Sequence, residues 1–325
     1  MGESVVLGAG SWGTALASLL AENGSKVSLW CRDEAHARQL DLDRENRQYL
    51  PGISLQPNIV PITTAPSQSD LWLLAVPSSG FREACSLLPT EPCRALIATK
   101  GLELGSALRM SEIVAQVRPD CTVGVISGPN LAMEVARGIP TASVVASNNK
   151  DFACEMQHII ATRSFRVYHS TDAVGVELGG ALKNVYALGA GMSDGLGFGD
   201  NTKGAFLARA LREMATLGVA LGAEHKTFLG LSGVGDLFAT AVSKLSRNYR
   251  VGRFLAEGIT ADAAIEKIGQ VAEGVPTSSA AQTLAERVGL PIPLMLSIRR
   301  VVSGDASPLQ ALADLMNRPA GPEFD

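Results

Sequence analysis

The feature that most constrains this chain is a glycine pattern close to its start. The apolar residues 5–7 lead into Gly8-Ala9-Gly10-Ser11-Trp12-Gly13, and a helical pattern follows. In such a G-x-G-x-x-G turn the backbone can approach a pyrophosphate closely, and the free N–H groups of the helix terminus can face it. The pattern therefore predicts a dinucleotide-binding loop, with a tight strand-to-helix turn that binds no ligand as the alternative.

The first half of the chain alternates short apolar runs with amphipathic ones. Buried strands are predicted at residues 5–10, 27–31, 70–77, 94–99, 121–126 and 141–146. Helices are predicted at residues 12–22, 80–88, 108–117 and 151–161. This βαβ alternation is typical of a doubly wound, mostly parallel α/β sheet, so we expect residues 1–172 to form a dinucleotide-binding Rossmann domain.

The second half of the chain has a different pattern. From residue 173 onward the apolar positions recur at helical spacing, and no comparable valine-rich run follows. We therefore expect residues 173–325 to form an all-α C-terminal domain that binds the substrate, and we place the boundary at Asp172.

Composition and charge exclude several classes of protein. With 46% hydrophobic residues the chain can bury a large core, and its net charge of −4 gives no basic face for nucleic acid. The longest apolar stretch, 174–192, contains Glu177 and Lys183, so we expect no membrane insertion. The five cysteines form no CxxC pair and the four histidines have no metal-like spacing, so we expect neither a disulfide framework nor a metal site. The sequence also starts without an export signal, which favours a cytoplasmic protein.

The end of the predicted second strand bears on the choice of cofactor. The strand ends in Trp30-Cys31-Arg32, whereas NAD-selective sites place an Asp or Glu about 20 residues past the glycines to bind the ribose 2′-hydroxyl. A cation can instead pair with a 2′-phosphate, so Arg32 favours NADPH over NADH. Asp33 leaves NADH as an alternative, and a solvated loop charge is the other interpretation of Arg32.

Lys183 is the main candidate for proton transfer. On a helix its neighbours three and four residues away are Gly179, Gly180, Tyr186 and Ala187, which form a small and mostly apolar face. A lysine on such a face is partly desolvated, and desolvation lowers its pKa toward the range useful for protonating a carbonyl oxygen. A solvated helix lysine is the alternative.

Two further segments suit a ligand that carries an anion and a hydroxyl group. Ser246, Arg247 and Asn248 stand just before a predicted helix, where a cap, backbone N–H groups and a guanidinium can bind a phosphate. A plain helix cap beside surface cations is the alternative. Asp236 follows the glycine-rich residues 230–235 and is either a helix N-cap or an acceptor for a substrate hydroxyl.

Lys100 and Gly128 each follow a predicted strand, at the edge where open α/β sheets bind ligands. Ordinary turn chemistry explains Gly128-Pro129 without any ligand. These two positions are therefore candidates for the site and also candidates for turns.

A series of motifs along the chain resembles the bacterial-type NAD(P)-dependent glycerol-3-phosphate dehydrogenase family. In order, the motifs are GAGSWGTALA, NRQYLPG, TKGLE, SGPNLAMEVARGIPT, STDAVGVELGGALKNVYALGAGMSDGLGFGDN, GLSGVGDL, LSRNYRVG and VAEGVPT. They span nearly the whole chain, whereas unrelated Rossmann proteins share only the first motif. The resemblance implies a Rossmann domain followed by a helical substrate domain.

The resemblance also implies an activity, the reduction of dihydroxyacetone phosphate to sn-glycerol 3-phosphate with NADH or NADPH, which supplies glycerophospholipid synthesis. It implies Lys183 as the general acid/base, acting on a substrate held between the two domains. The substrate-binding residues it implies, besides Lys183, are Lys100, Gly128, Asp236, Ser246, Arg247 and Asn248. The cofactor-binding residues it implies, besides Gly8, Gly10 and Gly13 of the loop, are Ser11, Trp12, Arg32, Lys100, Ala132, Arg247, Val271 and Glu273.

One position departs from the family pattern. Asn130-Leu131 stand where the family usually has Ser or Thr followed by an aromatic residue. Because an amide both donates and accepts hydrogen bonds, we expect Asn130 to replace the hydroxyl contact with the substrate.

Two other functions stay open on the residues alone. One is a two-domain dehydrogenase for a hydroxyacyl or sugar-acid substrate, and the other is a catalytically idle protein that binds NADPH and reports redox state to a partner. The oligomeric state also stays open, with a homodimer as one arrangement.

Overall fold

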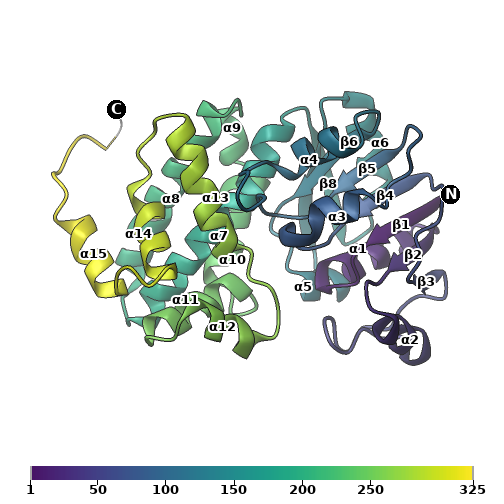
Figure 1. Cartoon of the computed structure of the whole chain (residues 1–325), viewed down its shortest axis with the longest axis horizontal. Helices are drawn as coiled ribbons and strands as arrows, with labels where there is room; N and C mark the ends of the chain where they lie inside the picture. The colour runs from purple at the N-terminus through teal and green to yellow at the C-terminus, as the bar shows by residue number, and fades with distance from the viewer. Residues whose placement is uncertain (1, 324–325) are drawn as a thin grey trace.

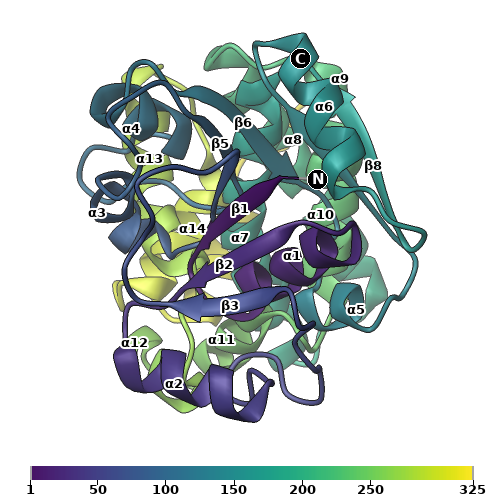
Figure 2. The same cartoon turned by 90° about the vertical axis from the view of Figure 1, so that its right-hand side faces the viewer.

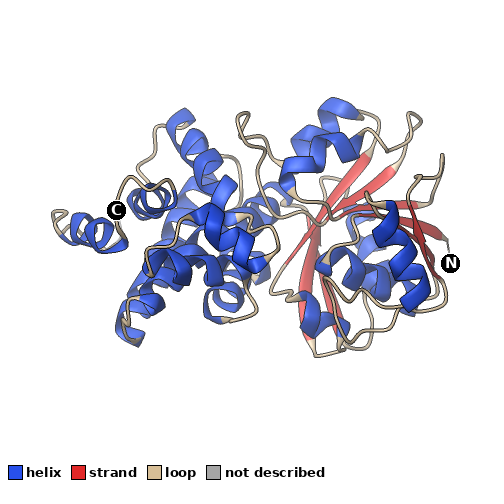
Figure 3. Ribbon diagram, turned by 60° about the horizontal axis from the view of Figure 1, so that its bottom comes forward, coloured by secondary structure: helices blue, strands red, loops and turns tan. Residues whose placement is uncertain are grey.

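The first half of the chain forms an eight-stranded sheet covered by helices, and the second half is helical. The computed structural model describes residues 2–323, and Figures 1 and 3 show the strands gathered at one end of the molecule. The strands are β1 (Glu3–Leu7), β2 (Lys26–Trp30), β3 (Ile59–Ile62), β4 (Leu71–Leu74), β5 (Arg94–Ile97), β6 (Thr122–Ser127), β7 (Thr141–Ala146) and β8 (Phe165–Ser170).

The sheet is doubly wound around β1. Its order is β3-β2-β1-β4-β5-β6-β7-β8, and all neighbouring strands run parallel except the antiparallel pair β6 and β7. Figure 2 views the molecule from the sheet end, with β1, β2 and β3 nearest the viewer and the helical half behind them. The expected α/β fold followed by a helical half is confirmed.

The six predicted strands all form, but the prediction missed the two edge strands, β3 and β8. In β3, Pro61 interrupts the run of strand-forming residues and removes a backbone donor. In β8, Phe165 and Val167 are buried while Arg166 and Tyr168 are exposed. Neither edge strand therefore shows the continuous apolar run that marked the inner strands.

Short helices connect the strands. They are α1 (Ser11–Glu22), α2 (Glu34–Asp43), the 3-10 turn η1 (Ser78–Gly80), α3 (Phe81–Cys85), α4 (Met110–Val117), α5 (Ala132–Ala136) and α6 (Lys150–Ile160). The four predicted helices are present, whereas α2 and α5 were not predicted. The prediction of a helix to residue 88 was too long, because Pro89 disfavours a helical conformation at the residue before it.

The second half is built around one long helix. The helices are α7 (Ala173–Gly195), α8 (Asp200–Ala220), α9 (His225–Phe228), the π-helical turn η2 (Leu231–Gly235), α10 (Asp236–Val242), α11 (Arg247–Ala256), α12 (Ala261–Ile268), α13 (Gly274–Arg287), α14 (Pro293–Val302) and α15 (Pro308–Met316). Every residue of α7 from Gly175 to Ser193 is buried, as expected for a helix surrounded by others.

Glycines let α7 and α11 cross with their backbones in contact. A Cβ atom on Gly191 would lie 2.0 Å from the carbonyl oxygen of Tyr249, and one on Gly252 would lie 2.0 Å from that of Leu188. Any side chain at either position would push the two helices apart. The main chains therefore set the spacing between α7, which contains Lys183, and α11.

The start of α7 joins the helical half to the sheet half through a group that we call the Glu177 site, formed by Glu177, Arg109 and Ser111. The Glu177 carboxylate accepts hydrogen bonds from the Ser111 backbone N–H at 2.8 Å and hydroxyl at 2.6 Å. It also pairs with Arg109 at 3.2 Å. Burial raises the pKa of Glu177, and the positive charge of Arg109 opposes that rise.

None of the individual helices within residues 2–323 is both long and apolar enough to cross a membrane. A pair of segments, 225–242 and 247–256, meets that test of length and composition jointly, but the two are bent by 51° at the break between them.

Candidate active site

Two lysines and an aspartate from distant parts of the sequence meet where the sheet and the helical half adjoin. The Lys183 Nζ donates to Asp236 Oδ1 at 2.6 Å and to the Thr240 hydroxyl at 2.7 Å. The Lys100 Nζ donates to Asp236 Oδ2 at 2.7 Å. We call these four residues the Asp236 site. Its carboxylate is 1% exposed and holds two ammonium groups at once.

Glycines on α7 allow Lys183 to reach this position. A Cβ atom on Gly180 would lie 2.5 Å from the Ser127 hydroxyl, and one on Gly179 would lie 2.5 Å from the Ser232 carbonyl oxygen. The helix therefore packs directly against the end of β6 and against η2. Lys183 is only 6% exposed, so the expected small face and the desolvated lysine are both present, and the solvated alternative is wrong.

Asp236 begins α10, directly after the π-helical turn η2. The N-cap position is Gly235, and no side chain caps the helix. The alternative that Asp236 is an N-cap is therefore wrong, because its carboxylate is bonded to the two lysines instead. Of the glycine-rich residues 230–235 before it, Leu231–Gly235 form the π-helical turn, whereas the sequence suggested a loop there.

Burial and charge shift the pKa values of this site in a direction useful for proton transfer. Burial lowers the pKa of Lys183 to about 8, with a further lowering by Lys100 and an opposing rise from Asp236. Burial alone would raise the pKa of Asp236, but the charges of Lys100 and Lys183 hold it below the usual value. Asp236 therefore remains a carboxylate that fixes both ammonium groups.

Each lysine keeps one N–H group that is not bonded within the described chain. An ammonium has three donors. Lys183 uses one for Asp236 and one for Thr240, and Lys100 uses one for Asp236 and one for the Gly128 carbonyl oxygen at 2.9 Å. The third N–H group of each remains for a ligand that carries oxygen atoms.

The backbone conformation at position 128 requires a glycine. Its φ of +148° lies in the left-handed region, and a Cβ atom there would lie 3.0 Å from the Ser143 Cα atom. Asn130, two residues later, is bonded to β7, because its Nδ2 donates to the Ala142 carbonyl oxygen at 3.3 Å and its Oδ1 accepts from the Ser143 hydroxyl at 3.0 Å. The amide of Asn130 thus fixes this loop, and one of its two N–H groups remains free.

The first turn of α11 brings three predicted residues together. Ser246 caps the helix, since its hydroxyl accepts from the Tyr249 N–H at 3.2 Å. Arg247 and Asn248 lie in the first turn, not before the helix as expected. Asn248 is buried. Its Nδ2 donates to Asn184 Oδ1 and its Oδ1 accepts from the Gly274 N–H, both at 2.9 Å.

Arg247 differs from Asn248 in being exposed to solvent. Part of the Arg247 side chain reaches solvent, but desolvation of its guanidinium by the surrounding protein lowers its pKa, and the charge of Glu273 opposes that lowering. The positive charge of Arg247 in turn helps to lower the pKa of Lys183, so the two cations lie close enough to interact electrostatically. Lys100, Lys183 and Arg247 outnumber the carboxylates Asp236 and Glu273, which suits an anionic ligand.

Glu273 joins the helical half to η1, the 3-10 turn that follows β4. Its carboxylate accepts from the backbone N–H of Ser78 at 2.9 Å and from the Ser78 hydroxyl. Burial raises its pKa, and these hydrogen bonds oppose the rise. Two other residues are expected near a cofactor. Val271 stands two residues before Glu273 and is exposed, and Ala132 is the first residue of α5.

The glycine loop has the form that a pyrophosphate requires. Gly8 has a φ of +115°, and a Cβ atom on Gly13 would lie 1.9 Å from the Gly8 carbonyl oxygen. A Cβ atom on Gly10 would have no heavy atom within 4 Å, so the space in front of the α1 terminus is open. No side chain caps α1, and the N–H groups at Ser11 and Trp12 precede the first intrahelical bond. The loop therefore fits a dinucleotide phosphate.

Arg32 and Asp33, after β2, have different surroundings. The Asp33 carboxylate caps α2 by accepting from the His36 N–H at 2.8 Å. Arg32 is exposed, and its side chain has no bonded partner within residues 2–323. One oxygen of the Asp33 carboxylate is thus bonded in the helix cap, and the Arg32 cation is free.

Sequence reasoning missed several residues that complete the site. Thr240 lies one helical turn after Asp236, and that spacing was the available signal. Asn184 follows Lys183, and its Nδ2 donates to the Lys100 carbonyl oxygen at 3.0 Å. Nothing in the sequence marked Ser78. Across residues 2–323, no three His, Cys, Asp or Glu side chains are grouped in a way that could hold a metal ion.

Two family models match the chain. Residues 4–153 match the model described as NAD-dependent glycerol-3-phosphate dehydrogenase N-terminus, and residues 172–313 match the one described as its C-terminus.

Individual relatives agree with these matches. The chain is 45% identical over 316 residues to glycerol-3-phosphate dehydrogenase (NAD(P)+) of Ectopseudomonas mendocina, with 96% of this chain and 93% of that protein covered. It is 44% identical to the enzyme of the same name from Halorhodospira halophila, with 98% of each covered. The crystal structure of glycerol-3-phosphate dehydrogenase from Coxiella burnetii superposes with a TM-score of 0.93 at 36% identity, covering 98% of this chain and 99% of that one.

Proposed function

The chain belongs to the NAD-dependent glycerol-3-phosphate dehydrogenase family and is an NAD(P)-dependent oxidoreductase, and on that premise we propose that it reduces dihydroxyacetone phosphate to sn-glycerol 3-phosphate. The observation that supports this proposal most directly is the Asp236 site. Its two lysines are fixed by one buried carboxylate, and each keeps an N–H group for an oxygen atom of a substrate.

Lys183 is the general acid for reduction and the general base for oxidation. Its pKa of about 8 lets it hold a proton at Nζ near neutral pH and release it to the ketone oxygen. Asp236 and Thr240 orient the ammonium, so its third N–H group points in one direction. A bound nicotinamide supplies the hydride to the ketone carbon.

The other residues of the proposed site bind the substrate and orient it. Arg247 and the capped first turn of α11 with Ser246 bind the phosphate, while Lys100 contacts a substrate oxygen beside Gly128. Binding energy from the phosphate then helps to place the carbonyl against Lys183. The proposed substrate-binding residues are Lys100, Gly128, Asn130, Lys183, Asp236, Ser246, Arg247 and Asn248.

The cofactor binds to the glycine loop and to residues at the junction of the two halves. Arg32 pairs with the 2′-phosphate of NADPH, because Arg32 is exposed and unpaired while Asp33 is occupied as a helix cap. The proposed cofactor-binding residues are Gly8, Gly10, Ser11, Trp12, Gly13, Arg32, Lys100, Ala132, Arg247, Val271 and Glu273.

We place the domain boundary at residues 172 and 173, between the end of β8 and the start of α7. We predict that the enzyme supplies glycerophospholipid synthesis and that it is cytoplasmic. A homodimer is one possible arrangement of the protein.

The test is steady-state oxidation of NADPH and of NADH by the purified protein with dihydroxyacetone phosphate, and with unphosphorylated dihydroxyacetone as the control. We expect turnover that depends on the phosphate and a lower KM for NADPH. Turnover that is equal with and without the phosphate would contradict the proposed role of Arg247. A lower KM for NADH would contradict the role of Arg32.

A further inference from the structure

Cys93 and Cys121 lie side by side although 28 residues separate them in sequence. Their Sγ atoms are 2.9 Å apart. Cys93 directly precedes β5 and Cys121 directly precedes β6. Arg94 and Thr122 are register partners, and the Thr122 N–H donates to the Cys93 carbonyl oxygen at 2.8 Å. The two cysteines therefore continue the pairing of β5 and β6 by one position.

This position suits a disulfide. Neighbouring strands are about 4.8 Å apart, which lies within the separation of Cα atoms that a disulfide spans. Partners in a parallel pair point to the same face of the sheet. Both cysteines pack against the core on one face, with Val125 and Met110 among its members.

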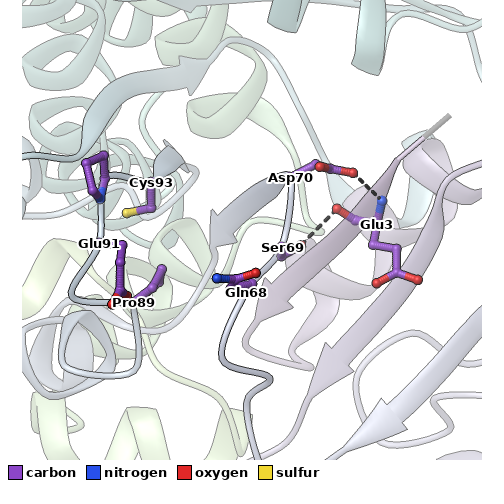
Figure 4. A pocket seen from close by; sticks show the side chains of 8 residues that line it. Glu3, Gln68, Ser69, Asp70, Pro89, Glu91 and Cys93 are labelled. Atoms are coloured by element: carbon purple, nitrogen blue, oxygen red, sulfur yellow. Dashed lines mark hydrogen bonds between the residues drawn. The ribbon is translucent and has the colours of Figure 1, made fainter.

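Both cysteines border hollows at the surface. Cys93 lines a hollow of about 400 Å³ together with Glu91, Asp70 and Pro89, as Figure 4 shows. Cys121 lines a second hollow of about 150 Å³ that also includes Glu91. A small molecule can therefore approach the pair from solvent. The carboxylates of Asp70 and Glu91 beside Cys93 favour a neutral molecule over an anion, while Arg118 and Asp120 both line the hollow beside Cys121.

We propose that Cys93 and Cys121 form a modification site that a small neutral peroxide converts into a disulfide. The thiolate of one cysteine attacks the O–O bond of hydrogen peroxide, forming a sulfenic acid and, after protonation, one molecule of water. The second thiol attacks the sulfenic sulfur, the S–S bond forms and a second water leaves. The peroxide gains two electrons and the two thiols lose them. Burial raises the pKa of Cys121, so attack on the peroxide by the Cys121 thiolate is slow.

The proposed disulfide links the starts of two strands whose other ends reach the active site. Lys100 follows β5, Gly128 follows β6, and the Lys100 ammonium donates to the Gly128 carbonyl oxygen. A bond between Cys93 and Cys121 closes a long loop and restricts the unfolded chain. We therefore expect unchanged turnover at 25 °C and a melting temperature about 5 °C higher.

The experiment treats the purified full-length protein with hydrogen peroxide and measures its intact mass, its linked peptides and its melting temperature. We expect a loss of about 2 Da per disulfide, a peptide that links Cys93 to Cys121, and reversal by dithiothreitol. Cys154→Ser is the matched control, because Cys154 is partly exposed like Cys121 but lies on α6 and takes no part in the Cys93–Cys121 contact, and this variant should behave as the wild type does.

Cys93→Ser and Cys121→Ser should each lose both the linkage and the rise in melting temperature. The proposal is overturned if both thiols of the wild type stay reduced, if each gains oxygen atoms separately, or if Cys93→Ser still forms the linkage at Cys121. Because the decisive readouts are the mass and the linked peptide of the wild type, a variant that fails to fold does not prevent the test.

Discussion

The Glu177 site and the Asp236 site are two buried carboxylates held by cations where the two halves of the molecule meet. Glu177 itself lies on α7, and Asp236 binds Lys183 of the same helix. Glu177 has one cation, a hydroxyl and a backbone N–H group as partners, and all of its partners are bonded in place. Asp236 accepts from two lysines and from the hydroxyls of Thr240 and Ser127, at 3.3 and 3.4 Å, and each lysine keeps a free donor.

The pKa shifts follow this difference. Burial raises the pKa of Glu177, whereas two ammonium groups hold the pKa of Asp236 below its usual value and the pKa of Lys183 is lowered. A single well-bonded ion pair fixes the position of α7. Burial and the charge of Lys100 lower the pKa of Lys183, as its proposed role in proton transfer requires. The number of cations on one buried carboxylate, one at Glu177 and two at Asp236, therefore distinguishes the pair that supports structure from the site proposed for chemistry.

The largest expected effect is that of Lys183→Ala on turnover. Loss of the proton donor should lower kcat by about 10²-fold or more, the scale of general acid–base catalysis. Steady-state kinetics with dihydroxyacetone phosphate measure it. Lys203→Ala is the control, because Lys203 pairs with Asp194 at 2.6 Å away from the Asp236 site. A Lys183→Ala protein that turns over normally would remove Lys183 from the mechanism and erase the contrast between the two sites.

Glu177→Ala should act on stability more than on chemistry. Removal of one partner leaves Arg109 without its buried counter-charge, so the free energy of unfolding should fall by about 3 kcal/mol. Denaturant unfolding measures it, and Glu177→Gln should lose less because it still accepts from Ser111. If Glu177→Ala instead kept its stability and lost 10²-fold in kcat, the two sites would share one role.

Arg247→Ala should raise KM for dihydroxyacetone phosphate by about 30-fold with little change in kcat, because a charged hydrogen bond to the phosphate is lost. Arg109→Ala removes a cation from the Glu177 site and serves as the matched control. We expect its KM to stay near that of the wild type. Equal KM values for the two variants would show that Arg247 does not bind the phosphate.

The last expected effect is a dependence on pH, which is no more than about tenfold for each pH unit. Reduction requires protonated Lys183, so kcat/KM for ketone reduction should fall tenfold per unit above about pH 8, and oxidation should gain as pH rises toward that value. Because the lysine pKa is lowered on folding, the folded protein releases this proton first, and stability should rise with pH from about 8 toward 10.5. A rate of reduction that stays flat from pH 7 to 10 would contradict the assignment. Nucleotide fluorescence titrations at each pH separate weaker cofactor binding from this effect.

The sequence predicted the inner parts of the fold better than the edges. Inner strands such as β4 and β5 are buried on both faces and show continuous apolar runs. The edge strands β3 and β8 contain a proline or alternate with exposed residues, and no local pattern reveals them. Their pairing depends on neighbours that are distant in sequence.

The site was predictable only where a local pattern exists. The glycine loop and the small face around Lys183 are visible within one helix or turn. The bonds of Asp236 to Lys100 and Lys183 cross 136 and 53 residues, and the contact between Cys93 and Cys121 crosses 28. Only the folded chain brings such pairs together, and the desolvation that lowers the Lys183 pKa exists only after it has folded.

If Lys183 and Arg247 bind the two ends of the substrate as proposed, the contact between α7 and α11 sets a limit on the substrate's length. Because Gly191 and Gly252 let the two main chains touch, the distance from Lys183 to the first turn of α11 is fixed by the backbone and not by adjustable side chains. A ketone with one more carbon between its carbonyl and its phosphate has to bend or leave one of the two contacts unmade. Substitutions that line the site can alter how tightly a substrate binds, but a change in preferred chain length requires a change at that helix crossing.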